Sequence, residues 1–159
     1  MELLEKHKIM ANAAIFAADT SSRGIGGPFG AAIVKDGQVI CIASNRVIED
    51  NDPTAHAEIT AIREACKILN TYDLTGCELY ATGYPCPMCL SAIIWANIKK
   101  VYYCNSSSEA AKIGFRDDFI YDYLRGNLNE SNVIDLEICE VAEGKKLYAD
   151  YADNNKIIY

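Results

Sequence analysis

The sequence predicts a three-layer α/β/α protein, with a five-stranded mixed sheet between helices. The first observation is a β-hairpin pattern early in the chain. The second is the alternation of short apolar runs with amphipathic helical patterns after that hairpin. A chain of 159 residues is long enough to bury one core, and it contains no linker, repeat or low-complexity segment. We therefore expect a single domain over residues 1–159.

The N-terminal part of the chain predicts a helix followed by a hairpin. Residues 2–20 carry one apolar stripe at helical spacing. Two β-prone runs, 29–35 and 38–43, are joined by an Asp-Gly pair at 36–37, which is the strongest short hairpin signal. The glycine-rich loop at 24–27 lies between a helix and a strand, the reverse of the context of a nucleotide-binding loop. We expect its glycines to permit close backbone contacts instead.

The middle of the chain predicts two more helices with a strand between them. The first of these helices begins at an N-cap, Asp52 or Thr54, and runs to about Leu69. Residues 77–83 form a buried strand, and Pro87 suits the first turn of the next helix. The remaining elements are a strand at 100–104, short helices at 109–112 and 117–124, a fifth strand at 133–138, and a helix at 141–152.

Composition and charge limit the possible partners. The net charge is −7 and the 15 Lys and Arg residues are dispersed, whereas proteins that bind nucleic acid gather basic side chains against phosphates. A small substrate is therefore favoured over a polynucleotide. No apolar run has the length of a membrane span, and no signal-peptide pattern begins the chain. Seven cysteines at irregular spacing argue against a disulfide framework, so we expect a cytoplasmic protein with no membrane partner.

Two short motifs carry the chemistry. One is a His-Ala-Glu run that contains His56 and Glu58, and the other is a Pro-Cys-Pro-Met-Cys run that contains Cys86 and Cys89. This combination is the pattern of zinc-dependent base deaminases. A catalytic zinc takes three protein ligands and keeps a position for water, whose pKa it lowers to about 7. His56, Cys86 and Cys89 provide three ligands of the required types, and Glu58 is available to move protons.

The Cys-x-x-Cys motif has alternative interpretations. It also occurs as a thioredoxin-like redox pair and as half of a four-ligand structural zinc site. A second cysteine pair is absent here, and the other five cysteines are scattered singly through apolar runs. A structural or redox module also has no use for Glu58. These observations favour the catalytic interpretation. A non-catalytic zinc-binding or redox module is kept as the alternative that is not an enzyme.

The resemblance to a known family extends beyond these motifs. The order of helix, hairpin, His-Ala-Glu helix, strand and Pro-Cys-x-x-Cys helix resembles the cytidine deaminase-like fold over nearly the whole chain. Residues 52–58 and 85–89 are similar to both bacterial guanine deaminases and tRNA adenosine deaminases. Residues 25–31, residues 114–121 and the C-terminal Tyr159 resemble guanine deaminases in particular. The resemblance implies a zinc hydrolase that converts guanine to xanthine and ammonia, with a tRNA adenosine deaminase as the alternative.

The resemblance also implies a set of site residues. It implies that one zinc ion per subunit is held by His56, Cys86 and Cys89. It implies that the proton shuttle is Glu58, and that the substrate is contacted by Asn45, Phe29, Asp117 and Tyr159. In that family the C-terminal segment is exchanged between subunits, so the resemblance implies a homodimer in which residues from about 140 to 159 cross to the partner.

One position departs from the family, and several of the implied roles have plainer explanations. The family usually has Glu immediately before Pro85, where this chain has Tyr84. Without this carboxylate beside a metal ligand, the preferred substrate is less certain, and guanosine, a triazine or a pterin are further candidates. Without the resemblance, Asn45 is a turn asparagine, Asp117 a helix cap and Phe29 a core aromatic.

Overall fold

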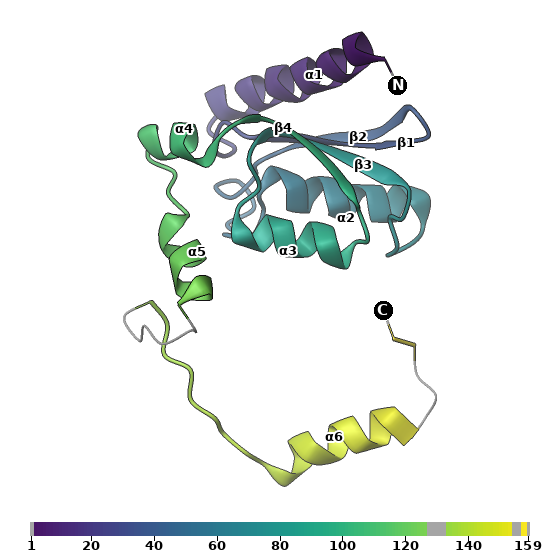
Figure 1. The fold of residues 1–159 in the computed structure, drawn as a ribbon, viewed down its shortest axis with the longest axis vertical. Helices are drawn as coiled ribbons and strands as arrows, with labels where there is room; N and C mark the ends of the chain where they lie inside the picture. The colour runs from purple at the N-terminus through teal and green to yellow at the C-terminus, as the bar shows by residue number, and fades with distance from the viewer. Residues whose placement is uncertain (1, 127–132, 154–156, 159) are drawn as a thin grey trace. The chain divides into compact units, whose positions relative to one another are not determined.

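The computed structural model describes residues 2–126, 133–153 and 157–158, and Figure 1 traces their path. The chain divides into two compact units, Met1–Asp122 and Tyr123–Tyr159. The first unit contains the sheet and the helices that cover it. The described part of the chain includes no helix that is both long enough and apolar enough to cross a membrane.

The first unit is organised around a four-stranded mixed sheet. Its strands are β1 (Gly30–Lys35), β2 (Gln38–Ser44), β3 (Cys77–Gly83) and β4 (Lys100–Asn105). Their spatial order is β2-β1-β3-β4, in which β1 pairs antiparallel with both β2 and β3, and β3 pairs parallel with β4. The parallel pair requires a crossover connection, which is the helix that carries the Pro-Cys-x-x-Cys motif.

The hairpin between β1 and β2 forms as the sequence predicts. Asp36 and Gly37 both adopt positive φ angles, 49° and 79°, which a two-residue turn requires if its twist is to match that of the strands. Gly37 accepts this conformation without a steric penalty. A register shift between Ile33 and Val34 marks an irregularity in β1.

Helices cover both faces of the sheet, which confirms the three layers. Figure 1 shows α1 (Leu3–Ser22) on one face, and α2 (Ala57–Leu69) and α3 (Pro87–Trp95) on the other. Alternate residues of β1 point to opposite faces, as the pleat dictates. Ala32 therefore packs with Ile9 of α1, whereas Ile33 packs in the larger cluster beneath α2 and α3.

The C-terminal part differs from the sequence prediction. Two short helices follow the sheet, α4 (Ser107–Lys112) and α5 (Asp118–Arg125), and the second unit contains α6 (Ala142–Asp153). The predicted fifth strand at 133–138 is wrong, because these residues form no strand. Ile134, Leu136 and Ile138 are all exposed. A run with β propensity becomes a strand only when it finds an edge to pair with and a surface to cover.

Candidate metal centre

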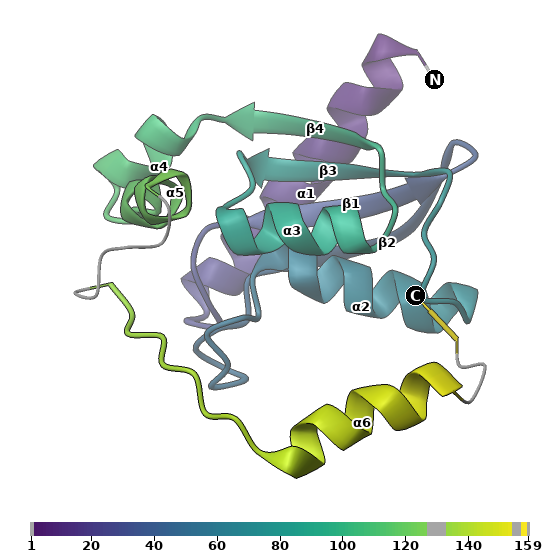
Figure 2. The same ribbon diagram turned by 60° about the horizontal axis from the view of Figure 1, so that its bottom comes forward.

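Two helix N-termini meet at one end of the sheet. Figure 2 shows α2 and α3 side by side on the same face, and His56 and Cys86 are their N-cap residues. His56 rather than Asp52 or Thr54 caps α2, because residues 52–55 form a turn before the helix begins. Pro87 occupies the first turn of α3 as predicted. The placement of both motifs at helix starts brings their side chains to one point.

The three predicted ligands converge as a cluster, which we call the metal-site cluster (His56, Cys86 and Cys89). The Nδ1 atom of His56 lies 3.5 Å from the Sγ atom of Cys86 and 3.6 Å from that of Cys89. All three candidate ligand atoms lie within 4.8 Å of one another. Zinc bonds of about 2.3 Å to sulfur and about 2.0 Å to nitrogen separate tetrahedral ligands by similar distances. One nitrogen and two sulfurs therefore fit zinc in both donor chemistry and spacing.

The electrostatics of the two thiols favour a thiolate at Cys86. A hydrogen bond from the Cys89 thiol lowers the pKa of Cys86 to about 4, and the backbone N–H of Cys89 also donates to its Sγ atom at 3.5 Å. The same interaction, followed by burial, raises the pKa of Cys89. The hydrogen bond between His56 and Cys86 raises the pKa of His56. Thiolate is the form of cysteine that binds a metal.

Glu58 lies beside the metal-site cluster in the first turn of α2. Residues two apart on a regular helix point in very different directions, but His56 lies at the N-cap, outside the regular helix. Only 8% of Glu58 is exposed, and burial raises the pKa of its carboxyl group. Cys86, His56 and Cys89 all contribute to its electrostatic environment. A buried carboxyl group beside a metal site is chemically suited to proton transfer.

Asn45 stands at the end of β2 and organises the loops around the site. It is 5% exposed, and its Oδ1 atom accepts hydrogen bonds from the backbone N–H groups of Gly27 (3.2 Å) and Val47 (3.1 Å). A Cβ atom at Gly26 would lie 2.2 Å from the Asn45 carbonyl oxygen, so this approach requires glycine. The amide oxygen of Asn45 therefore serves the loop, and its amino group is the part available to a ligand.

The other predicted substrate residues differ in what the structure says of them. The Phe29 ring is half-buried and packs edge to face against Phe115, with centroids 4.9 Å apart. Asp117 is half-buried, and its pKa is raised by burial and then by the charge of Cys86. Arg116 pairs with Asp118 at 2.7 Å. Tyr159 lies outside the described residues.

Comparison with known proteins identifies the family. The family model for the cytidine and deoxycytidylate deaminase zinc-binding region matches residues 4–105. The chain belongs to the cytidine and deoxycytidylate deaminase family. This membership makes it a hydrolytic deaminase with a zinc-binding region, and it supports zinc as the metal that the cluster binds.

Individual members of the deaminase family are similar to this chain to different extents. The guanine deaminase of Bacillus subtilis (strain 168) is 54% identical over 112 residues, which cover 70% of this chain and 72% of that protein. The crystal structure of the Bacillus subtilis guanine deaminase superposes with a TM-score of 0.89 at 40% identity, covering 100% of this chain and 99% of that one. The tRNA-specific adenosine deaminase of Aquifex aeolicus is 55% identical over 76 residues, 48% of this chain and 50% of that protein.

Two features of this deaminase escaped the sequence analysis. The ring of Tyr84 packs edge to face on Tyr103 of β4, at 5.1 Å between centroids, and Tyr84 is 40% exposed. The hydroxyl of Tyr121 donates to the carbonyl of Pro85 at 2.9 Å, immediately before the first motif cysteine. The sequence gives no signal for either contact, because both join segments that are distant along the chain.

Proposed function

We propose that this protein is a cytoplasmic, zinc-dependent guanine deaminase that converts guanine and water to xanthine and ammonia. The observation that carries the proposal is the extent of similarity. The sequence similarity to the Bacillus subtilis guanine deaminase covers 70% of the chain, whereas that to the tRNA-specific adenosine deaminase covers 48%. The likeness to the guanine deaminase structure covers 100% of the chain.

In this proposal the metal-site cluster holds one zinc ion per subunit. Zinc bound there supplies Lewis acidity that makes a water molecule ionise near neutral pH. Glu58 accepts a proton from the attacking water and delivers it to a ring nitrogen of guanine. It then takes the second proton, from the hydroxyl that has added to the ring carbon, and passes it to the amino group. The carbon–nitrogen bond breaks, ammonia leaves and the carbonyl of xanthine forms. The burial of Glu58 suits this role, because a carboxyl group with a raised pKa both accepts and returns a proton.

The remaining predicted residues orient the base. The Asn45 amino group donates to an acceptor of the purine, since its Oδ1 atom is already used by Gly27 and Val47. The Asp117 carboxylate accepts from the N–H groups on the guanine edge, and the Phe29 ring lies against the base. Tyr159 closes the pocket. Asn45 thus bonds an acceptor of the base and Asp117 bonds its donors. A base without this pattern of acceptor and donors binds less well, so the two residues select among aminated bases.

We further propose a homodimer that exchanges the segment from about residue 140 to 159. The helix α6 supports this proposal, because its apolar side chains Leu147, Tyr148 and Tyr151 are all exposed. Light scattering coupled to gel filtration measures the assembly, and a dimer is expected. Mixing inactive Glu58→Gln chains with Tyr159→Ala chains is expected to restore activity, because one mixed site then has both native residues. A monomer, or mixtures without recovery, would contradict the exchange.

The test of substrate is ammonia release by zinc-loaded protein from guanine, guanosine, adenine, cytosine and an adenosine-containing tRNA stem-loop. Release from guanine is expected, and Tyr84 is then a tolerated variation. Turnover of the stem-loop, with strong salt dependence, would favour the second candidate, a tRNA adenosine deaminase, which the 55% identity over 76 residues supports. The net charge of −7 argues against that candidate. Release from another base would redirect the proposal to that base.

A further inference from the structure

Tyr121 contacts two segments that the proposed reaction needs. Its hydroxyl donates to the Pro85 carbonyl at 2.9 Å, and Pro85 directly precedes Cys86 of the metal-site cluster. Its backbone N–H donates to the carbonyl of Asp117 at 3.3 Å, where α5 begins. One residue is thus hydrogen-bonded both to the metal-site loop and to the residue that carries the candidate substrate carboxylate.

The segment around Asp117 is held on its other side by an aromatic contact. Phe115 packs edge to face on Phe29, at an interplanar angle of 89°. Arg116 meanwhile donates to both carboxylate oxygens of Asp118, at 3.1 and 2.7 Å. Asp117 is therefore the acidic residue of this pair that Arg116 does not neutralise, and the charges of Cys86 and His56 contribute to its environment.

The helix α5 is short, and two of its large apolar side chains are exposed. It contains 8 residues, which is shorter than a helix needs to be stable by itself. Phe119 is 50% exposed and Leu124 is 53% exposed, so the burial of apolar side chains contributes little at these positions. The hydrogen bond to the Pro85 carbonyl therefore ties the start of α5 to the loop that carries Cys86.

We infer that Tyr121 is a positioning residue that fixes the Asp117 carboxylate relative to Cys86 and so sets the affinity for the base. The inference rests on the proposed function and deepens it. Tyr121 does not touch the base in this account. It acts through Asp117, and its hydroxyl is the group that matters.

The test compares Tyr121→Phe with Tyr123→Phe. Tyr123 lies on the same helix, and its buried hydroxyl has no hydrogen-bond partner among the described residues, so its removal is a matched control. Tyr121→Phe is expected to raise KM for guanine about 5- to 10-fold, the effect of one lost hydrogen bond, with a smaller change in kcat and unchanged zinc content. Tyr123→Phe is expected to leave all three unchanged.

A double-mutant cycle separates positioning from a general loss of structure. If Tyr121 acts through Asp117, Tyr121→Phe has little further effect on KM in an Asp117→Asn background, so the two effects are not additive. Full additivity would overturn the inference. The cycle uses whichever base of the ammonia-release panel the wild-type protein deaminates.

Hydrogen–deuterium exchange provides a readout that needs no substrate. Tyr121→Phe is expected to speed amide exchange in peptides covering 83–90 and 114–120, whereas Tyr123→Phe leaves the 83–90 peptide unchanged. Identical exchange in the two variants would overturn the inference even if guanine is turned over. A wild-type protein that deaminates no base would overturn the proposed function, while exchange would still decide whether Tyr121 ties the two segments.

Discussion

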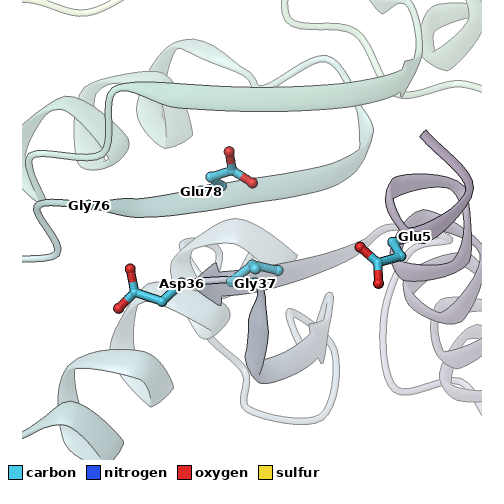
Figure 3. A pocket seen from close by; sticks show the side chains of 6 residues that line it. Glu5, Asp36, Gly37, Gly76 and Glu78 are labelled. Atoms are coloured by element: carbon cyan, nitrogen blue, oxygen red, sulfur yellow. The ribbon is translucent and has the colours of Figure 1, made fainter. Parts of the chain in front are cut away.

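The two ends of the sheet both gather ionisable side chains, and they use them differently. At the C-terminal end of β3, the metal-site cluster and Glu58 lie at the starts of α2 and α3. At the opposite end, Glu5, Asp36 and Glu78 line a pocket together with Val34, Gly37 and Gly76 (Figure 3). These three carboxylates come from α1, the hairpin turn and β3.

The comparison teaches that burial and helix ends, rather than the number of acids, create a reactive site. Glu5 and Asp36 are exposed, and Glu78 already accepts a hydrogen bond from the Tyr80 hydroxyl at 3.2 Å. Glu58 is enclosed beside cysteines whose protonation is perturbed. Water solvates the first set of carboxylates, whereas the protein itself must solvate Glu58.

The largest expected difference between the two ends concerns a cysteine at each. Cys89→Ser removes a predicted zinc ligand, so the protein is expected to lose zinc on dialysis against a chelator and to lose all turnover. Cys77→Ala, at the start of β3 and 3% exposed, is expected to cost about 1 kcal/mol of stability through a small cavity and to keep its zinc. Atomic absorption of the dialysed proteins measures both. Equal zinc retention in the two variants would disprove the ligand assignment.

A glutamate at each end gives the next largest effect. Glu58→Gln keeps the size of the side chain but removes the proton shuttle, and kcat is expected to fall about 100- to 10,000-fold with zinc retained. Glu78→Gln, in the opposite pocket, is expected to leave kcat unchanged. Ammonia release by zinc-loaded proteins provides the measurement. Normal turnover by Glu58→Gln would show that another group moves the protons.

Asn45→Asp separates the structural role of Asn45 from its predicted contact with substrate. The aspartate keeps an oxygen for the N–H groups of Gly27 and Val47 but lacks the amino donor. Thermal stability is therefore expected to change little, while kcat/KM for guanine falls about 10- to 100-fold because a substrate acceptor is left unpaired. A variant that keeps its kcat/KM would mean that Asn45 serves the loops alone.

How far the sequence predicts this molecule depends on how local each signal is. The Asp-Gly turn at 36–37 and Pro87 act on their own backbone, so the hairpin and the start of α3 are confirmed. The convergence of His56 with Cys86 is predicted because the two motifs together match a known zinc site, whose ligands must meet at one metal. The predicted N-cap of α2, Asp52 or Thr54, is wrong: Asp52 and Thr54 bond to each other in a turn before the helix, and such a turn has the same residue types as a helix cap.

Features that depend on distant partners could not be predicted. Residues 133–138 have strand-like composition, but a strand needs a neighbouring edge that the sequence does not specify. The bond from Tyr121 to Pro85 joins residues 36 positions apart, and tyrosine hydroxyls carry no motif. The role of Tyr159 stays a prediction, as do the single domain and the swapped dimer, since each depends on residues or chains beyond those described.

The smallest expected effects come from two similar turns, one beside the metal-site cluster and one away from it. Asp52 accepts from the backbone N–H and hydroxyl of Thr54 at 2.8 and 2.7 Å, and Asp73 accepts from those of Thr75 at 2.9 and 2.6 Å. These bonds, led by the threonine hydroxyl in each case, lower the pKa of both aspartates. Each carboxylate therefore stabilises the fold above its unfolded pKa of about 3.9, and this contribution is lost as the pH falls through the lower folded value.

Asn substitutions at the two turns have a shared effect and a distinct one. Both Asp52→Asn and Asp73→Asn are expected to lower Tm modestly at pH 7, with the difference from wild type shrinking below about pH 4. Only Asp52→Asn is expected to raise KM and loosen zinc, because the turn it closes places His56, whose N–H donates to the Thr54 carbonyl at 2.7 Å. Melting curves across pH, together with zinc retention, measure both effects. Equal zinc retention in the two variants would mean that α2, rather than the turn before it, holds His56 in place.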